Sequence, residues 1–500
     1  MPIAPFRHAL PPELSLPVLA RSLADTGRPL VWLDSGPDAR EGVSVLALAD
    51  SVLRTGDGVG PEEFLDRLRA ALRPGDEEPA PAGPFGEALP RFRLGWALHL
   101  DYEFGLSLLG LPAAAPRALA LRVTAAVELD HASGTLTLLA ESEAIRDSWL
   151  ATHASALRTA PPVAPAAPSE PSAPSPPPGT VTAWRHTDDA YRDRILACQE
   201  RIRAGDAYVL CLTNEAVRPA PRGPASDPLA LYLRLREVSP AHHGGLIWVP
   251  PEPGPAGTGN AGTGHAAEAL LSASPERFLA VTGDGRVSTV PIKGTRPRSA
   301  DPARDAALAA ELAANEKERA ENLMIVDLMR NDLSRVCAPG SVRVGRFLAV
   351  EPYRHVFQLT STVTGALAPG LDALDALRSC FPAGSMTGAP KRSAAQILAG
   401  LEQGDRGGYS GCFGYLSHGG DADLAMVIRS IVLRDGLARV GAGGGITADS
   451  VPEEEMAEVH LKAAALLRVL GAEIGESAPE KRAILEAWVQ TQPENAERCE

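Results

Sequence analysis

Lysine is rare among the basic residues of this chain, and its rarity suggests that the lysines present have chemical roles. Only five lysines occur among 500 residues, and the other 43 of the 48 basic residues are arginine. An amine can lose its proton and attack an electrophile, whereas a guanidinium cannot. Four of the lysines stand in dense polar or glycine-rich strings, at positions 293, 317, 391 and 462. We predict that Lys293, in V-P-I-K-G-T-R, is a nucleophile.

Glu276, in S-P-E-R-F-L, is the residue expected to act with Lys293. It lies 17 residues earlier, and the Asp284-Gly285 pair between them is typical of a hairpin turn. The paired strands of a hairpin bring its two ends together. An acid beside an amine suits protonation of a leaving group combined with nucleophilic attack. The alternative is a cross-strand salt bridge without a catalytic role.

Four carboxylates recur at helical spacing and could hold a metal ion. They are Glu318 and Glu321, in a helix expected over 303–333, and Glu455 and Glu458, in a helix expected over 452–470. Residues three or four apart share one face of a helix. One or two carboxylates from each helix suit a Mg²⁺ ion that keeps waters and binds a ligand oxygen. For the second helix alone, a solvated face with an ion pair between Glu458 and Lys462 is the simpler interpretation.

Two glycine-rich strings indicate places where backbone approaches something closely. They are F-P-A-G-S-M-T-G-A-P-K, ending at Lys391, and G-A-G-G-G-I-T-A-D-S, which starts at Gly441. The second leads into a helix, so its amides could receive an anion, while tight turns are the alternative for both. Neither string matches a dinucleotide-binding fingerprint or a phosphate-binding loop, so nucleotide binding is not predicted.

Composition excludes several classes of function. A formal net charge of −14 argues against nucleic acid and anionic membranes as partners. No apolar run reaches the length of a membrane span, and the first residues lack the apolar segment of a signal peptide. Six scattered cysteines suit reduced thiols better than a disulfide framework or a zinc site. We expect a soluble cytoplasmic protein.

Proline-rich segments divide the chain. Residues 159–180 form a Pro/Ala/Ser linker between an N-terminal region, 1–158, and a C-terminal region, 181–472. The stretch 251–265 resembles an inserted surface loop, and 473–500 is a polar tail.

Strand and helix patterns alternate in both regions. Strands are expected over 92–100, 121–130 and 135–140, and hairpins about Asp284-Gly285 and Asp435-Gly436. A capping box from Ser450 to Glu453 is expected to start the last helix. Hairpins mixed with helices predict an α+β fold, with two closely packed halves built on antiparallel sheets and flanked by helices.

Taken together, these strings resemble the chorismate-utilising enzymes, which include component I of anthranilate synthase and of aminodeoxychorismate synthase, and the isochorismate and salicylate synthases. The matching strings include S-P-E-R-F, P-I-K-G-T-R-P-R, K-E-R-A-E-N-L-M-I-V-D-L, F-P-A-G-S-M-T-G-A-P-K and G-A-G-G-G-I-T-A-D-S. The match is dense from Trp184 to about Leu470 and loose in the N-terminal region, which resembles that of anthranilate synthase component I. P-I-K-G-T resembles the aminodeoxychorismate synthase subgroup, where anthranilate synthases carry P-I-A-G-T.

The resemblance implies a covalent mechanism. Lys293 would add to C2 of chorismate as the 4-hydroxyl leaves, with Glu276 as the general acid. Ammonia would then attack C4 and expel the lysine, giving 4-amino-4-deoxychorismate, a precursor of 4-aminobenzoate and folate. Burial near magnesium is expected to lower the pKa of Lys293 and so aid attack.

The resemblance also assigns ligands. Mg²⁺ would be bound by Glu321 and Glu458, with Glu318 and Glu455 in the surrounding shell, and would neutralise a chorismate carboxylate. The positions that match substrate contacts are Gly294, Thr295, Tyr409, Arg429, Gly443, Gly444, Gly445 and Lys462.

Three positions bear on which of these enzymes the chain resembles. Val209 stands where water-adding relatives have a basic lysine and amine-adding ones usually Gln or Glu, which argues against isochorismate synthase. Gln358 replaces a histidine of many relatives, and glutamine is familiar there in the aminodeoxychorismate subgroup. W-L-D-S, ending at Ser35, resembles a tryptophan-binding segment, but the rest of that pocket is not recognisable.

No cysteine stands in a nucleophile-elbow context in these 500 residues, so ammonia is expected from a glutamine amidotransferase partner. The alternatives to an aminodeoxychorismate synthase component I are an anthranilate synthase component I and a non-catalytic paralogue that binds chorismate.

Overall fold

The structure is a computed structural model, and it describes residues 5–56, 58–72, 83–158, 182–222, 226–251 and 266–472. The expected linker, nearly all of the expected 251–265 insertion and the tail therefore lie outside the described residues.

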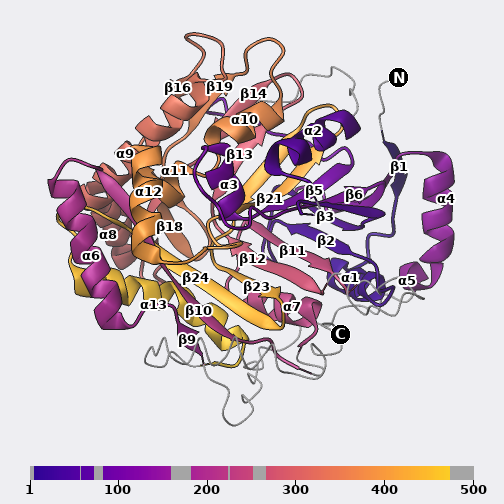
Figure 1. Ribbon diagram of the computed structural model, residues 1–500. Helices are drawn as coiled ribbons and strands as arrows, with labels where there is room; N and C mark the ends of the chain where they lie inside the picture. Colours follow the sequence, from indigo (N-terminus) through magenta and orange to yellow (C-terminus); the bar gives the residue numbers. More distant parts are fainter. Residues whose placement is uncertain are drawn as a thin grey trace.

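Two large antiparallel sheets pack face to face, with helices on their outer faces (Figure 1). A core cluster that includes Ile247 and Leu270 of the first sheet and Leu121 and Phe413 of the second fills the space between them. This architecture confirms the α+β prediction, because alternate residues of each strand can bury one face against the other sheet and one against helices.

The first sheet contains twelve described strands. In sheet order they are β1 (Phe6–Ala9), β8 (Thr135–Ala140), β7 (Ala125–Asp130), β3 (Val43–Leu48), β2 (Leu30–Asp34), β11 (His243–Val249), β12 (Glu268–Ser274), β23 (Ser430–Arg434), β24 (Leu437–Ile446), β10 (Val209–Pro219) and β20 (Gly388–Ala389), with β9 (Ala183–Trp184) also paired to β10. The helices that cover its outer face are α1 (Leu16–Ala24), α4 (Glu143–Thr152), α5 (Ala154–Arg158), α6 (Asp188–Arg203), α7 (Pro228–Val238), α12 (Lys391–Glu402) and α13 (Pro452–Val469).

The second sheet contains nine described strands. They are β16 (Arg343–Val344), β19 (Val363–Ala366), β14 (Arg286–Thr289), β13 (Arg277–Val281), β22 (Ala422–Met426), β21 (Cys412–Ser417), β5 (Gly95–Leu100), β6 (Ala118–Val123) and β4 (Ser51–Arg54). Its outer helices are α2 (Pro61–Ala71), α3 (Tyr102–Leu108), α9 (Glu316–Ser334), α10 (Ala373–Cys380) and α11 (Gly384–Thr387).

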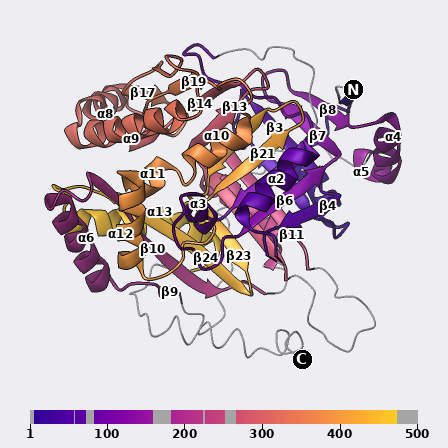
Figure 2. The same ribbon diagram turned by 45° about the horizontal axis from the view of Figure 1, so that its top comes forward.

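A third, small sheet lies at one end of the molecule beside α8 (Pro302–Ala314), as Figure 2 shows. Its strands are β15 (Ile292–Pro297), β18 (Val356–Thr360) and β17 (Ala349–Pro352).

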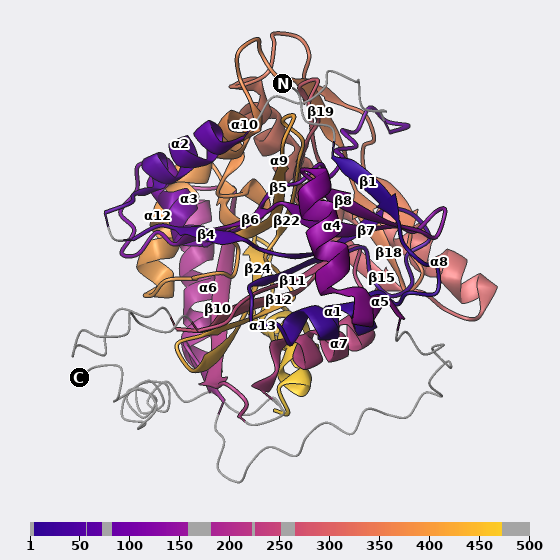
Figure 3. The same cartoon turned by 90° about the vertical axis from the view of Figure 1, so that its right-hand side faces the viewer.

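The N-terminal and C-terminal regions share both large sheets. β2 pairs with β11, and β5 pairs with β21, so each sheet is completed by strands from both regions. α2 also lies beside α10, where Arg69 forms ion pairs with Asp372 and Asp375 (Figure 3). The boundaries predicted for the regions stay a prediction, because the linker is not described.

The expected strand over 121–130 is two strands in different sheets. β6 ends at Val123 in the second sheet and β7 begins at Ala125 in the first. Asp50 holds the crossing, since the amide and the hydroxyl of Thr124 both donate to its carboxylate, at 3.1 and 2.5 Å. An unbroken apolar alternation does not reveal such a change of sheet.

Two helix predictions also need correction. The helix expected over 303–333 is divided at Asn315, which ends α8 and caps α9 by accepting from the amide of Glu318 at 3.1 Å. Ser450 does not cap α13, because Val451 occupies that position. The Ser450 hydroxyl instead donates to Glu455 Oε1 at 2.8 Å. Both hairpins form as predicted.

The five described cysteines are free and buried. None of the described helices combines the length and the apolar composition needed to cross a membrane.

Lys391 is a structural lysine. Its ammonium is 2.5 Å from Asp332 Oδ2 and donates to the carbonyl of Cys380 at 2.8 Å, and both charged side chains are almost fully buried. A buried charge that loses its partner is strongly destabilising.

We predict that Lys391→Met lowers the free energy of unfolding by about 3–5 kcal/mol, because Asp332 is left without its counter-ion. Urea denaturation measures the loss. The neighbouring, exposed Arg392→Met is the control, expected to cost less than about 1 kcal/mol, and an equal loss in the two variants contradicts the assignment.

Candidate active site

Strand β24 presents bare backbone where the site forms. Three glycines occupy alternate positions and so leave one face of the strand without side chains: Gly441, Gly443 and Gly445. A Cβ on Gly445 would stand 3.3 Å from both Lys293 Nζ and Glu321 Oε2. Glycine at this position lets the catalytic candidates approach the strand itself.

One edge of β24 is open. β23 pairs with it only at residues 437–439, so among the described strands none covers the rest of the edge that faces away from β10. Lys462 Nζ donates to the Gly443 carbonyl at 2.7 Å, which places this carbonyl on the open edge. The N–H and C=O of one strand residue point to the same side, so the Gly443 and Gly445 amides face this edge too. Such amides can bind an anionic oxygen, as expected for these glycines.

Three lysine–glutamate ion pairs gather around this strand. The N–O distances are 3.5 Å for Lys293–Glu321, 2.8 Å for Lys317–Glu455 and 2.7 Å for Lys462–Glu458. The carboxylates come from α9 and α13, so the two predicted helices do bring them together. Each carboxylate has its own ammonium, which limits the cost of removing the charges from water.

The electrostatics of this group follow from the pairing. Burial acts to raise the pKa of Glu458, yet Lys462, Lys317 and Lys293 outweigh burial and lower it. For Glu321 the effect of burial is larger than that of the lysines, so its pKa is raised despite the positive charges of Lys293 and Lys317.

Glu318 and Glu455 differ in position. Glu455 is 2% exposed and lies against Gly444, whose added Cβ would be 2.9 Å from Glu455 Oε2. Glu318 lies beside β15, 3.5 Å from Arg296, and a Cβ on Gly294 would stand 2.9 Å from its carboxyl carbon. Gly294 therefore admits Glu318 to the strand that carries Lys293.

Glu276 stands at the turn between β12 and β13, close enough to Lys293 for their charges to interact. It is 6% exposed, and burial raises its pKa to about 7, although a hydrogen bond from Ser385 and the charges of Lys293 and Lys462 act in the opposite direction. A carboxyl group that is half protonated near pH 7 suits a general acid.

The lowered pKa expected for Lys293 is wrong for the protein groups alone. Burial does act to lower it, but the ammonium lies beside the Cys211 thiol and near the carboxylates of Glu321, Glu276 and Glu458, and these neighbours raise the pKa above its ordinary value. Lys293 therefore needs a nearby proton acceptor, or a cation that neutralises these carboxylates, before it can attack.

Strand β10 lines the site beside Gly445, and only one of its residues there, Val209, was identified from the sequence. Val209 is buried, with Cγ2 3.4 Å from the position of a Cβ on Gly445, so an apolar group does stand beside the Lys293–Glu321 pair. Cys211 lies opposite Gly445 in the sheet and donates to the Ser385 carbonyl at 3.0 Å. Neither Cys211 nor Ser385 was predicted for the site, and alternation along β10 is the signal that finds Cys211.

The other predicted residues are spread around this centre. Tyr409 lies near enough to Arg429 for the guanidinium to influence its phenol, and the charge of Glu458 also acts on Arg429. Thr295 is exposed on β15, opposite the buried Gln358 of β18. The roles of these residues stay predictions.

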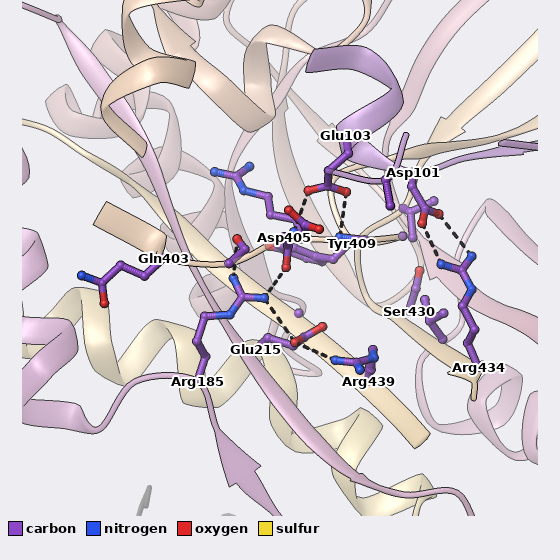
Figure 4. Close-up of a pocket in the computed structure, with 18 of the residues that line it drawn as sticks. Asp101, Glu103, Arg185, Glu215, Gln403, Asp405, Tyr409, Ser430, Arg434 and Arg439 are labelled. Atoms are coloured by element: carbon purple, nitrogen blue, oxygen red, sulfur yellow. Dashed lines mark hydrogen bonds and ion pairs between the residues drawn. The ribbon is translucent and has the colours of Figure 1, made fainter. Parts of the chain in front are cut away.

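A cavity of about 680 Å³ is lined by residues that include Tyr409 and Gly441 (Figure 4). Some of its charged side chains pair with each other: Arg434 with Asp101 at 2.7 Å, and Arg185 with Glu215 at 3.2 Å. Nothing in the sequence predicted this hollow, because the residues that line it come from segments far apart in the chain.

Ser35 borders another cavity, of about 1100 Å³, together with Asp34, His243, Arg277 and Tyr415. This cavity lies between the two large sheets, away from Lys293. The resemblance of the Ser35 segment to a tryptophan-binding segment stays a prediction.

An α+β fold of two facing antiparallel sheets, with paired lysines and glutamates around a glycine strand, defines the class of this protein. A family model described as chorismate binding enzyme matches residues 29–468. The chain belongs to this family of chorismate-binding enzymes.

Relatives within the family carry two names. The chain is 39% identical over 438 residues to an aminodeoxychorismate synthase of Streptomyces pristinaespiralis (85% of this chain, 57% of the relative) and 42% identical over 386 residues to one of Streptomyces griseus (76% and 50%). It is 39% identical over 398 residues to anthranilate synthase component 1 of Streptomyces coelicolor (76% and 73%). The chain thus spans about half the length of the first two relatives.

The fold matches a solved structure over most of both chains. Anthranilate synthase component I of Streptococcus pneumoniae is 28% identical, with a TM-score of 0.67, over 87% of this chain and 93% of that one.

We predict that Gly445→Ala lowers kcat/KM for chorismate by about tenfold to a hundredfold, because the added methyl displaces Lys293 and Glu321 from their positions. Initial rates of chorismate consumption measure the effect. Gly400→Ala is the control, since a methyl there meets no atom within 4 Å, and unchanged turnover in Gly445→Ala contradicts the prediction.

Proposed function

We propose that this protein is an aminodeoxychorismate synthase component I, which converts chorismate and ammonia to 4-amino-4-deoxychorismate. The observation that carries the proposal is the Lys293 ammonium, held between Glu276 and Glu321 against bare backbone. The names of the two Streptomyces relatives support the same activity.

Glu276 and Lys293 share one mobile proton in the proposed mechanism. Transfer of a proton from the Lys293 ammonium to Glu276 produces a neutral amine and a neutral acid at once. The amine adds to C2 as the 4-hydroxyl departs, and the Glu276 proton leaves with it as water. Ammonia then forms a bond to C4, the C2–Nζ bond breaks, and the proton lost by the new amine returns to the pair.

Magnesium fits the proposed site. The Lys317 ammonium already stands near Glu455, Glu321 and Glu458, so the donor set accepts a cation. Within the described residues no group of three or more His, Cys, Asp or Glu side chains is arranged to hold a metal by itself. Because Mg²⁺ usually takes only one or two carboxylates from a protein, Glu321 and Glu458 would suffice to hold it, with water and substrate as its other ligands. When bound, it would neutralise a substrate carboxylate and the two glutamates.

The substrate's second carboxylate has a separate place in the proposal. Lys462 and the amides of Gly443 and Gly445 converge on the open edge of β24, and Arg429 lies near Tyr409. These positive groups would offset the repulsion of an anionic substrate by an acidic protein.

Ammonia would come from a glutamine amidotransferase. Val209 argues against water as the nucleophile, because an alkyl side chain at this place cannot take a proton from water.

Anthranilate synthase component I is the second candidate, since relatives at similar identity carry that name. Lys293 distinguishes the two, because C4 amination by double displacement needs an enzyme nucleophile. A non-catalytic chorismate-binding paralogue is the third, and the intact Glu276–Lys293 pair argues against it.

We predict that the protein, incubated with chorismate, Mg²⁺ and ammonium, forms 4-amino-4-deoxychorismate, and that Lys293→Ala slows this C4 amination at least about a hundredfold by removing the nucleophile. Chromatography with mass spectrometry identifies the product. Anthranilate and pyruvate from the wild type, or C4 amination at the normal rate in Lys293→Ala, would reject the proposal.

We also predict how the rate depends on pH. The reactive form, with Glu276 protonated and Lys293 neutral, is one arrangement of the pair when it holds a single proton. This state forms as pH rises through the Glu276 pKa of about 7 and persists until the raised pKa of Lys293 is reached. The ratio kcat/KM should rise through about pH 7 and level off, and Glu276→Gln should remove that rise. A fall above pH 7 in the wild type would contradict the shared proton.

A further inference from the structure

Lys317 is a lysine that the proposed chemistry does not use. It stands in the first turn of α9, and its Nζ donates to Glu455 Oε1 at 2.8 Å. Glu455 is 2% exposed, whereas the Lys317 side chain is 44% exposed. An ammonium on a flexible, half-exposed stem therefore reaches toward the buried carboxylates of Glu455 and Glu321 and the exposed carboxylate of Glu458.

The charges around this ammonium are those of the proposed metal site. Glu321 and Glu458 act on Lys317 as well as Glu455 does. Their combined negative charge outweighs burial and keeps Lys317 charged. Without a cation, the three carboxylates would repel one another, and water screens the buried Glu321 and Glu455 poorly.

The other two lysines of the site are held more firmly. Lys462 bonds both Glu458 and the Gly443 carbonyl, and Lys293 lies deep beside Glu276. Lys317 has a contact within hydrogen-bond distance to Glu455 alone among the described residues. Its four-carbon stem is flexible and half-exposed, so the ammonium can move into solvent once another cation compensates Glu455.

We infer that Lys317 is the built-in counter-ion of the metal site: its ammonium neutralises Glu455, Glu321 and Glu458 in the metal-free protein and must leave when Mg²⁺ binds. Lys317 is then a positioning residue that holds the carboxylates together and sets the affinity for the metal. The inference rests on the magnesium site of the proposed function.

Removal of the competing charge is the direct test. In Lys317→Met the stem remains and the ammonium is lost, so a divalent ion no longer displaces a cation. Binding of Mn²⁺ and Mg²⁺ without substrate, followed by calorimetry and by the electron paramagnetic resonance signal of free Mn²⁺, should become about three- to tenfold tighter. The rise in melting temperature on addition of Mg²⁺ should also be larger than in the wild type.

Arg319→Met provides the matched control, because it removes one positive charge from the same helix turn but contacts the Ala313 carbonyl. It should leave the dissociation constant for Mn²⁺ within about twofold of the wild type. Lys317→Gln is the second variant, for use if the methionine variant does not fold.

The outcomes separate the two proposals. If the wild type binds no Mn²⁺, or Glu321→Gln and Glu458→Gln bind it normally, the magnesium site and the inference with it are wrong. If those glutamates are needed but both Lys317 variants bind Mn²⁺ no more tightly than the wild type, only the role of Lys317 is wrong. Tighter binding in Arg319→Met to the same degree also overturns it.

Discussion

The arrangement around β24 depends on charge neutralisation in a poorly screened place. Glu321 and Glu455 are nearly buried, and each approaches a glycine of this strand within contact distance of where a Cβ would be. Carboxylates at this depth are stable only beside cations. Three of the five lysines of an otherwise arginine-rich chain supply them, and a compact ammonium suits a narrow space better than a planar guanidinium.

Both regions of the chain are needed to hold this arrangement. The catalytic candidates lie in the C-terminal region, but the loop that carries Tyr409 is held by the N-terminal helix α3. Glu103 accepts from the amides of Arg406 and Gly407 at 2.8 and 3.0 Å. Arg406 then bonds Glu402 and the carbonyl of Cys211, next to the Lys293 site. The shared sheets and this buried network join the two regions into one framework for the site.

Sequence patterns predicted the features that depend only on residues close together in the chain. The two Asp-Gly hairpins and the helix spacing of the glutamates follow from short-range geometry, so their positions could be derived from the sequence. The change of sheet at Thr124, the division at Asn315 and the contact from Ser450 to Glu455 depend on side chains that meet in the fold. Cys211, Ser385 and the role of Lys317 were missed for the same reason, because their contacts join segments far apart in the chain.

The pKa of Lys293 shows why the site must be treated as a unit. The carboxylates that would bind a metal also hold the proton on the proposed nucleophile, since Glu321, Glu276 and Glu458 all raise that pKa. A positive charge that pairs with Glu321 and Glu458 weakens their hold on the Lys293 proton. The same step leaves Glu276, with its own pKa near 7, as the acceptor for that proton. In the proposed enzyme, cation binding and activation of the amine are therefore two consequences of one electrostatic change.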